Sequence, residues 1–338
     1  MATTMNDVAA LAGVSVKTVS NVINGYPYIR PETRERVEDA IRSLDYRLNA
    51  AARSLRAGRS RTITLAIPEL TQPYFAELAQ AVIDEAAAVD LTVFVETTGG
   101  LAERELAIVS GDQPVLSDGL IFSPQGMSPD EAGAIKPGVP TVLLGERVFH
   151  TRFDHVTMAN VDAADAAVGH LLDLGRRRIV LMGARADEPH VGTGALRLQG
   201  ALRAFERRGL EPVRELIRFC EAWDRANGEA AVERLHAEQT PFDAVFAMND
   251  ALALGALRGV LLRGGRVPDD VAVVGFDDTL DARYATPSLT SIAPGRQEIA
   301  RVAVELLHSR FGGFTEEGTH AEVTAAFELL IRESTVGR

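Results

Sequence analysis

The chain has 338 residues, 46% of them hydrophobic, which exceeds what one hydrophobic core usually supports and predicts two or three compact units. With Cys220 as its lone cysteine and no N-terminal apolar stretch typical of a signal peptide or membrane span, it is expected to be a cytoplasmic protein without disulfide bonds. The formal charge of −12 divides unevenly: residues 1–61 hold 10 Lys and Arg against 6 Asp and Glu (+4), and residues 62–338 hold 25 against 41 (−16). This asymmetry indicates a basic nucleic-acid-binding module attached to an acidic body.

Capping residues and apolar spacing predict three helices at the start of the chain. Thr4 is expected to cap the first, with the acidic Asp7 three positions later. Gly13 breaks that helix and allows a tight turn, after which Ser15 can cap a second one. Pro31 suits the first position of a third helix. The core of this unit is expected to contain Val8, Ala9, Leu11 and Ala12, then Val16, Val19, Val22 and Ile23, and finally Val37, Ile41 and Leu44.

Residues 47–61 lack a comparable apolar pattern. They carry five arginines around the small-residue run Asn-Ala-Ala-Ala at 49–52. This composition is typical of a linker that becomes helical only when a partner holds it.

From residue 62 onward, short apolar runs alternate with amphipathic segments. Strands are predicted at 63–67, 91–95, 119–122, 141–144, 178–182, 216–219, 244–247 and 271–274. Helices are predicted at 75–89, 162–174, 196–208, 228–237, 251–263 and 297–309. This α/β alternation predicts parallel sheets covered on both faces, arranged as two doubly wound lobes with a ligand site at the carboxyl ends of the strands.

Residues 5–25 closely resemble the helix-turn-helix of the LacI/GalR repressor family, and residues 31–37 and 45–49 continue the likeness. In a helix-turn-helix the second helix enters the major groove, so Val16 and Lys17 are expected to read bases. The alternatives are a helix-packing valine and a solvated lysine. Relatives often carry arginine where this chain has Asn21 and a small capping residue where it has Arg30, so no operator sequence is transferred. The DNA-contacting residues expected from the resemblance are Thr4, Ser15, Val16, Lys17, Thr18, Ser20, Asn21, Asn24, Arg53 and Leu55.

Residues 49–58 resemble the hinge helix of the same family, which forms on operator DNA. Leu55 occupies the position of the leucine that this helix inserts into the minor groove, where an apolar wedge unstacks a base step and kinks the duplex. The alternative is a linker leucine that packs on the core.

The rest of the chain resembles the family's effector-binding core, which is similar to periplasmic sugar-binding proteins. The implied ligand contacts offer a donor fork, an amide and a carboxylate, which suit vicinal hydroxyls, together with a tryptophan face for a sugar ring. Trp223 could instead fill the core, Asp277 could only end a strand, and Tyr74 and Phe75 could only pack their helix. The expected ligand-binding residues are Tyr74, Phe75, Met158, Arg197, Trp223, Asn249 and Asp277.

Two departures bear on the ligand. Many sugar-binding relatives have aspartate where this chain has Gly145, so either Glu146 replaces it or the pocket holds a different ligand. Pro294 stands where several relatives carry glutamine.

The expected organisation is a three-helix DNA-binding head, a hinge and a two-lobed core. The boundaries are 1–48 for the head, 49–61 for the hinge and 62–338 for the core, with an N-lobe of about 62–160 and 293–321 and a C-lobe of about 161–292 and 322–332. The predicted function is that of a homodimeric transcriptional repressor, neither an enzyme nor a membrane protein, which needs no cofactor or metal. Its partners would be a palindromic operator and a small effector, with a sugar favoured.

Three other functions are compared with this prediction. A purine-binding, corepressor-dependent regulator is suggested by residues 193–195 and 282–284, whereas Trp223 favours carbohydrate. A transport-type binding protein would lack the DNA-binding head. An enzyme of doubly wound fold would need a phosphate loop, a dinucleotide fingerprint or a nucleophile constellation, and the sequence contains none that we can place.

Overall fold

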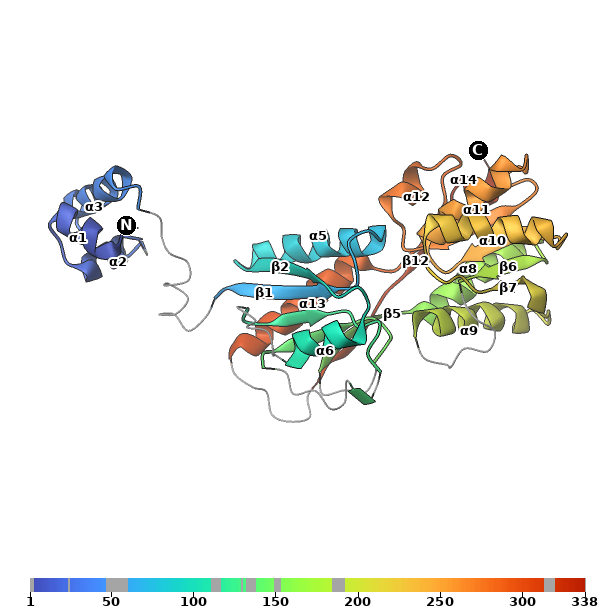
Figure 1. Ribbon diagram of the computed structural model, residues 1–338, viewed down its shortest axis with the longest axis horizontal. Helices are drawn as coiled ribbons and strands as arrows, with labels where there is room; N and C mark the ends of the chain where they lie inside the picture. Colours follow the sequence, from blue (N-terminus) through green and yellow to red (C-terminus); the bar gives the residue numbers. More distant parts are fainter. Residues whose placement is uncertain are drawn as a thin grey trace. The chain divides into compact units, whose positions relative to one another are not determined.

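The chain forms two compact units, Met1–Ser60 and Arg61–Arg338, each with its own hydrophobic core. The predicted α/β class, with a helical head and a two-lobed parallel core, is confirmed (Figure 1). The computed structural model describes residues 3–23, 25–46, 60–110, 117–128, 130–131, 138–148, 153–183, 192–312 and 320–337.

The described part of the head contains three helices, α1 Met5–Ala12, α2 Val16–Ile23 and α3 Pro31–Ser43. The predicted cap of α1 is present: the Asp7 N–H donates to Thr4 Oγ1 at 3.4 Å, and the Thr4 N–H donates to Asp7 Oδ2 at 2.8 Å. Gly13 ends α1 in the left-handed region with φ of 63°, which favours glycine. The buried core consists of Val8, Ala9, Ala12, Val19, Val22, Val37 and Ala40.

The prediction that Leu11 belongs to this core is wrong, because its side chain is 57% exposed. Residues 8, 9 and 12 define the buried face of α1, and a residue at position 11 is rotated by roughly 100° from the centre of that face.

The first lobe of the core is a six-stranded sheet in the order β11-β5-β4-β3-β1-β2, and all its strand pairs are parallel. Helices α5 and α13 cover one face and α6 the other, since side chains from alternate strand positions join separate clusters. The elements in its described residues are β1 Thr62–Ile67, α5 Pro73–Ala88, β2 Thr92–Thr97, α6 Ala102–Ser110, β3 Leu120–Phe122, β4 Thr141–Leu144, β5 Asp154–Met158, α13 Arg296–Ser309, the short η2 Arg310–Gly312 and β11 Glu322–Ala325.

The second lobe is another six-stranded sheet, in the order β12-β10-β9-β8-β6-β7, with only the β10–β12 pair antiparallel. Helices α8 and α9 cover one face, and α10 and α11 cover the other. The elements are α8 Asn160–Asp173, β6 Ile179–Met182, α9 Thr193–Glu206, η1 Arg214–Leu216, β7 Ile217–Arg218, α10 Arg225–Ala237, β8 Ala244–Ala247, α11 Asp250–Leu262, β9 Ala272–Phe276, α12 Leu280–Tyr284, β10 Thr290–Ala293, β12 Glu328–Leu330 and α14 Glu333–Val336.

The chain passes between the lobes three times, after β5, after β10 and after β11. The third crossing occurs later in the sequence than predicted. Residues 322–325 were predicted to belong to the C-lobe, but they form β11, which pairs with β5 in the first sheet from Glu322 opposite His155 to Ala325 opposite Met158. The first lobe therefore extends to about residue 325.

Candidate functional site

A cavity of about 490 Å³ lies in the core at the carboxyl ends of strands from both sheets. This is the edge where doubly wound sheets bind ligands. All seven residues expected to contact a ligand line it: Tyr74, Phe75, Met158, Arg197, Trp223, Asn249 and Asp277.

Arg197, on α9, is buried and lines the cavity. Its Nε donates to Asn160 Oδ1 at 2.7 Å, its Nη1 donates to the carbonyl of Met248, and its Cζ lies 3.5 Å from the centroid of the Phe276 ring. Burial lowers the pKa of the guanidinium, and the nearby carboxylates, first among them Asp277, oppose this shift. Because an arginine pKa starts so high, Arg197 stays charged and offers its remaining N–H groups to the cavity.

Asp277 follows β9 directly and faces Arg197, with Oδ1 4.0 Å from Nη1. Its φ of 121° is unfavourable for a residue with a side chain, and the backbone is held by an N–H donated to the Ile292 carbonyl at 2.8 Å. Arg296 Nη1 donates to the Asp277 carbonyl at 2.9 Å. Burial raises the pKa of the carboxyl well above its usual range, and Arg197 opposes that rise.

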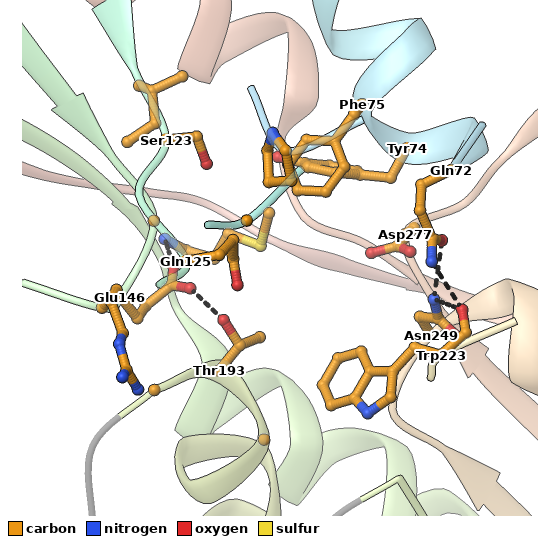
Figure 2. A pocket seen from close by; sticks show the side chains of 18 of the residues that line it. Gln72, Tyr74, Phe75, Ser123, Gln125, Glu146, Thr193, Trp223, Asn249 and Asp277 are labelled. Carbon is orange, nitrogen blue, oxygen red and sulfur yellow. Dashed lines mark hydrogen bonds between the residues drawn. The ribbon is translucent and has the colours of Figure 1, made fainter. Parts of the chain in front are cut away.

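Trp223 and Asn249 form one side of the cavity together with Gln72, which the sequence analysis did not identify (Figure 2). The Trp223 Nε1–H donates to the Gly183 carbonyl at 2.9 Å, which fixes the orientation of the indole. Asn249 caps α11 by accepting the Leu252 N–H at 2.9 Å, while its Nδ2 donates to the Trp223 carbonyl at 3.0 Å.

Gln72 connects the two lobes from the position preceding α5. Its Nε2 donates to the Trp223 carbonyl at 2.9 Å, and its Oε1 accepts from Asn249 Nδ2 at 3.4 Å. A polar residue at the start of a helix that follows a strand is the only sequence signal it carries.

Tyr74 and Phe75 cover the cavity from the first turn of α5, with ring centroids 5.3 Å apart in an edge-to-face arrangement. Burial, reinforced by the charges of Asp277 and Glu146, raises the pKa of the Tyr74 hydroxyl. Tyr74 therefore stays neutral and can donate a hydrogen bond to a ligand.

A second polar group, formed by Ser123, Gln125, Glu146 and Thr193, lies across the open space from Trp223 and Asn249 (Figure 2). Of these, the sequence analysis named Glu146, as a possible replacement for the aspartate of relatives, and residue 193, as part of a segment that suggests a purine-binding regulator. Ser123 and Gln125 follow β3 at the same sheet edge, and this position at the end of a strand is the sequence signal that could have identified them as ligand-site residues.

The loop that carries Gln125 is held by Glu105, a fully buried carboxylate on α6. Glu105 accepts the backbone N–H groups of Gln125 at 2.8 Å and Met127 at 2.8 Å, and both its oxygens lie within 3.2 Å of the Gly126 nitrogen. This buried anchor fixes the backbone at the edge of the cavity.

In the head, Ser15 caps α2 by accepting the Thr18 N–H at 3.2 Å, and Lys17 is exposed. Val16 is half-buried and packs against the core of the head, which is the helix-packing role given above as the alternative to base reading. Thr4 is exposed, whereas Thr18, Ser20 and Asn21 are half-buried. The remaining predicted DNA contacts, Asn24, Arg53 and Leu55, lie outside the described residues.

Within the described ranges, no group of three or more His, Cys, Asp or Glu side chains is placed to hold a metal ion. No helix in that same part of the chain is long and apolar enough to cross a membrane.

The helix-turn-helix head and the ligand-sized cavity define a DNA-binding regulator with a ligand-binding core. Residues 4–49 match the family model for bacterial regulatory proteins of the lacI family, and residues 168–335 match a periplasmic binding protein-like domain. The transcriptional regulator CelR of Thermobifida fusca is 35% identical over 345 residues, covering 98% of each chain. The chain belongs to the LacI family of bacterial regulators, as its resemblance predicted, and is not an enzyme.

Three solved structures show the same fold. A LacI-family regulator from Sanguibacter keddieii has a TM-score of 0.76 and 47% identity, covering 82% of this chain and all of that one. A complex of CelR with cellobiose has a TM-score of 0.70 and 31% identity, covering 98% and 99% of the two chains. The lac repressor dimer bound to operator and an anti-inducer has a TM-score of 0.85 and 27% identity, covering 99% of each.

Proposed function

We propose that this protein is a transcriptional repressor that binds a palindromic operator as a homodimer and responds to a sugar held in the core cavity. The observation that carries the sugar assignment is the convergence of Arg197, Asn249 and Asp277 with the face of Trp223 on one cavity. These groups supply donors and acceptors for ring hydroxyls and an apolar surface for the C–H face of a sugar ring. The relative CelR, solved with cellobiose, supports the same ligand class.

The DNA contacts are proposed from the helix-turn-helix geometry. The exposed Lys17 near the start of α2 is placed to donate to guanine acceptors, with Val16 beside it. The full proposed set remains Thr4, Ser15, Val16, Lys17, Thr18, Ser20, Asn21, Asn24, Arg53 and Leu55. Residues 49–61 would serve as the hinge, with Leu55 as the minor-groove wedge.

Homodimerisation is proposed because one recognition helix reads too few bases and a two-fold operator pairs with a two-fold protein. The core also exposes large apolar side chains. Phe94, on the edge strand β2, is 55% exposed, and Leu280 and Tyr284, on α12, are 58% and 76% exposed. The solved lac repressor, a dimer on its operator, supports this assembly.

Sugar and operator are coupled if each favours one arrangement of the two lobes. Direct contacts between the lobes, among them those of Gln72 and of Thr193 with Glu146, would be strengthened by a ligand that touches both sides. A sugar that favours the arrangement that DNA disfavours lowers operator affinity, and one that favours the same arrangement raises it.

The test is a thermal-shift screen of the full chain against neutral sugars, sugar phosphates, nucleosides and purines. A ligand that binds only the native state raises the unfolding midpoint by mass action, so a neutral sugar is expected to do so. A response confined to purines would overturn the sugar assignment. Operator titrations with and without the sugar then measure the coupling, and a steep fall in affinity with salt is expected from the phosphate contacts.

A further inference from the structure

We propose that the cavity selects its effector by charge: it accepts a hydroxyl-rich ligand that is neutral or carries an amine, and Glu146 rejects the corresponding acids and phosphates. This inference rests on the proposed sugar-sensing function and specifies the chemical class of the sugar.

Glu146 places a buried carboxylate at the cavity. It follows β4 after Gly145, whose φ of 86° favours glycine, and it is only 3% exposed. Its Oε1 accepts the Met158 N–H at 2.9 Å, and its Oε2 accepts the Thr193 hydroxyl at 3.0 Å (Figure 2). No charged side-chain nitrogen of a described Lys, Arg or His lies within 4.0 Å of its carboxylate oxygens, so Glu146 forms no salt bridge among the described residues.

The two described arginines that line the cavity donate hydrogen bonds to groups other than Glu146. Arg197 faces Asp277 at 4.0 Å and donates to Asn160 and to a backbone carbonyl, so its closest polar partners are groups other than Glu146. Arg147 Nε donates to the Met127 carbonyl at 3.1 Å. The buried ionisable groups among the described lining residues are therefore two carboxyls and one guanidinium, and Asp277, not Glu146, is the carboxyl that lies within 4.0 Å of that guanidinium.

The lone pairs of Glu146 define what can face it. An ionised carboxylate has about four acceptor sites. Two are occupied by Met158 and Thr193, which leaves acceptor capacity for a hydroxyl or an ammonium of the ligand. A ligand carboxylate or phosphate at this end would instead face the like charge of a carboxylate that is only 3% exposed, which is strongly unfavourable.

The pocket is also divided in a way that suits a ligand with two polar ends. Glu146, Gln125 and Ser123 lie on one side of the open space, and Asn249 and Asp277 lie on the other (Figure 2). A volume of about 490 Å³ falls within the range of small-molecule sites and leaves room for more than one sugar ring.

Isothermal titration of the full chain with related sugars of three charges tests this inference. The probes are cellobiose, its aldonic acid cellobionate and the doubly amino-substituted glucosamine dimer, together with glucose, glucuronate and glucosamine. The acids are expected to bind at least roughly tenfold more weakly than the neutral sugars, and the amines no more than roughly tenfold more weakly. Equal or tighter binding of an acid would overturn the role of Glu146 while leaving sugar sensing intact. If none of the six bound and a purine did, the proposed function itself would fail, and this inference with it.

The substitution Glu146→Gln removes the charge but keeps the shape, and the Thr193 hydroxyl can rotate to accept from the new amide. It is expected to narrow the ratio of cellobionate to cellobiose dissociation constants at least roughly fivefold. Glu221→Gln, at the exposed rim of the same cavity, makes the same charge change and should alter that ratio by less than about twofold, because water screens it. Similar effects of both substitutions would show that the discrimination comes from net charge and not from Glu146.

Discussion

Replacing Gln72 with alanine would remove a direct hydrogen-bonded link between the two lobes of the core. The link consists of the 2.9 Å bond from Gln72 Nε2 to the Trp223 carbonyl and the longer 3.4 Å bond from Asn249 Nδ2 to Gln72 Oε1. A neutral hydrogen bond contributes about 0.5–1.5 kcal/mol net, so we count only the shorter one. Losing it would lower the ratio of joined to separated lobes by about 2- to 12-fold.

A ligand that needs the joined arrangement should lose affinity by up to this factor, which is reached when the joined arrangement is the minor one, because its apparent affinity scales with the fraction able to bind it. Titration calorimetry of Gln72→Ala with cellobiose, or with the sugar that most raises the unfolding midpoint, measures this loss. Gln80→Ala is the matched control: it removes the same residue type from the exposed side of α5, where Gln80 bonds only within its own helix, to Asp84 at 2.8 Å. Unchanged binding by Gln72→Ala, or an equal loss in the control, would refute the expectation that this link limits ligand affinity.

Four further predictions concern stability and DNA binding. Gly255→Ala should lower the free energy of unfolding by at least about 2 kcal/mol in a denaturant titration, because the added Cβ would lie 2.0 Å from the Arg225 carbonyl where α10 and α11 touch; an unchanged midpoint would contradict this packing. Burial raises the pKa of Asp250 to about 7, so the contribution of its protonated carboxyl to stability is complete below about pH 4 and is lost as the pH rises to 7. The difference in unfolding free energy between the native chain and Asp250→Asn should therefore fall over this pH range. A difference that does not change with pH would contradict the raised pKa. Lys17→Ala should weaken operator binding by about 1–3 kcal/mol and leave sugar binding unchanged, as gel shifts and calorimetry can show. Leu55→Ala should weaken operator binding strongly with sugar binding intact, and unchanged operator affinity would remove its wedge role.

The long, regular elements were predictable from sequence because burial on both faces of a parallel sheet leaves continuous apolar runs. The strands at 141–144 and 244–247 were predicted with their observed bounds. The strands that escaped prediction carry polar residues: β5 begins Asp-His, β10 begins Thr-Ser, and β11 and β12 both begin with glutamate. Their polar groups bond to distant segments, as when Asp154 accepts from Arg310, so no local pattern marks them.

The candidate ligand residues were located through family resemblance and position at strand ends, and the structure brings them around one cavity. What sequence could not supply was how they pair. Gln72 bonds to Asn249 in the other lobe, 177 positions away in the sequence. Thr193 likewise bonds to Glu146, 47 positions away. Such contacts depend on how the two sheets face each other, which is a tertiary property that no local signal carries. Leu11 is a prediction that was made and was wrong: its hydrophobicity suggested burial, but the geometry of α1 leaves it exposed.

The three passages of the chain between the lobes have a consequence for synthesis. Each sheet gains an edge strand only from residues 322–330, since β11 lies at the edge of the first sheet and β12 at the edge of the second. The head, by contrast, is continuous within residues 1–60 and makes its core from helices that are close in sequence. On a ribosome, the head can fold while the core is still being made, and both lobes must wait for the same late segment before their sheets are complete. A nascent chain would therefore have a folded DNA-reading head before it has a finished sensor to control it.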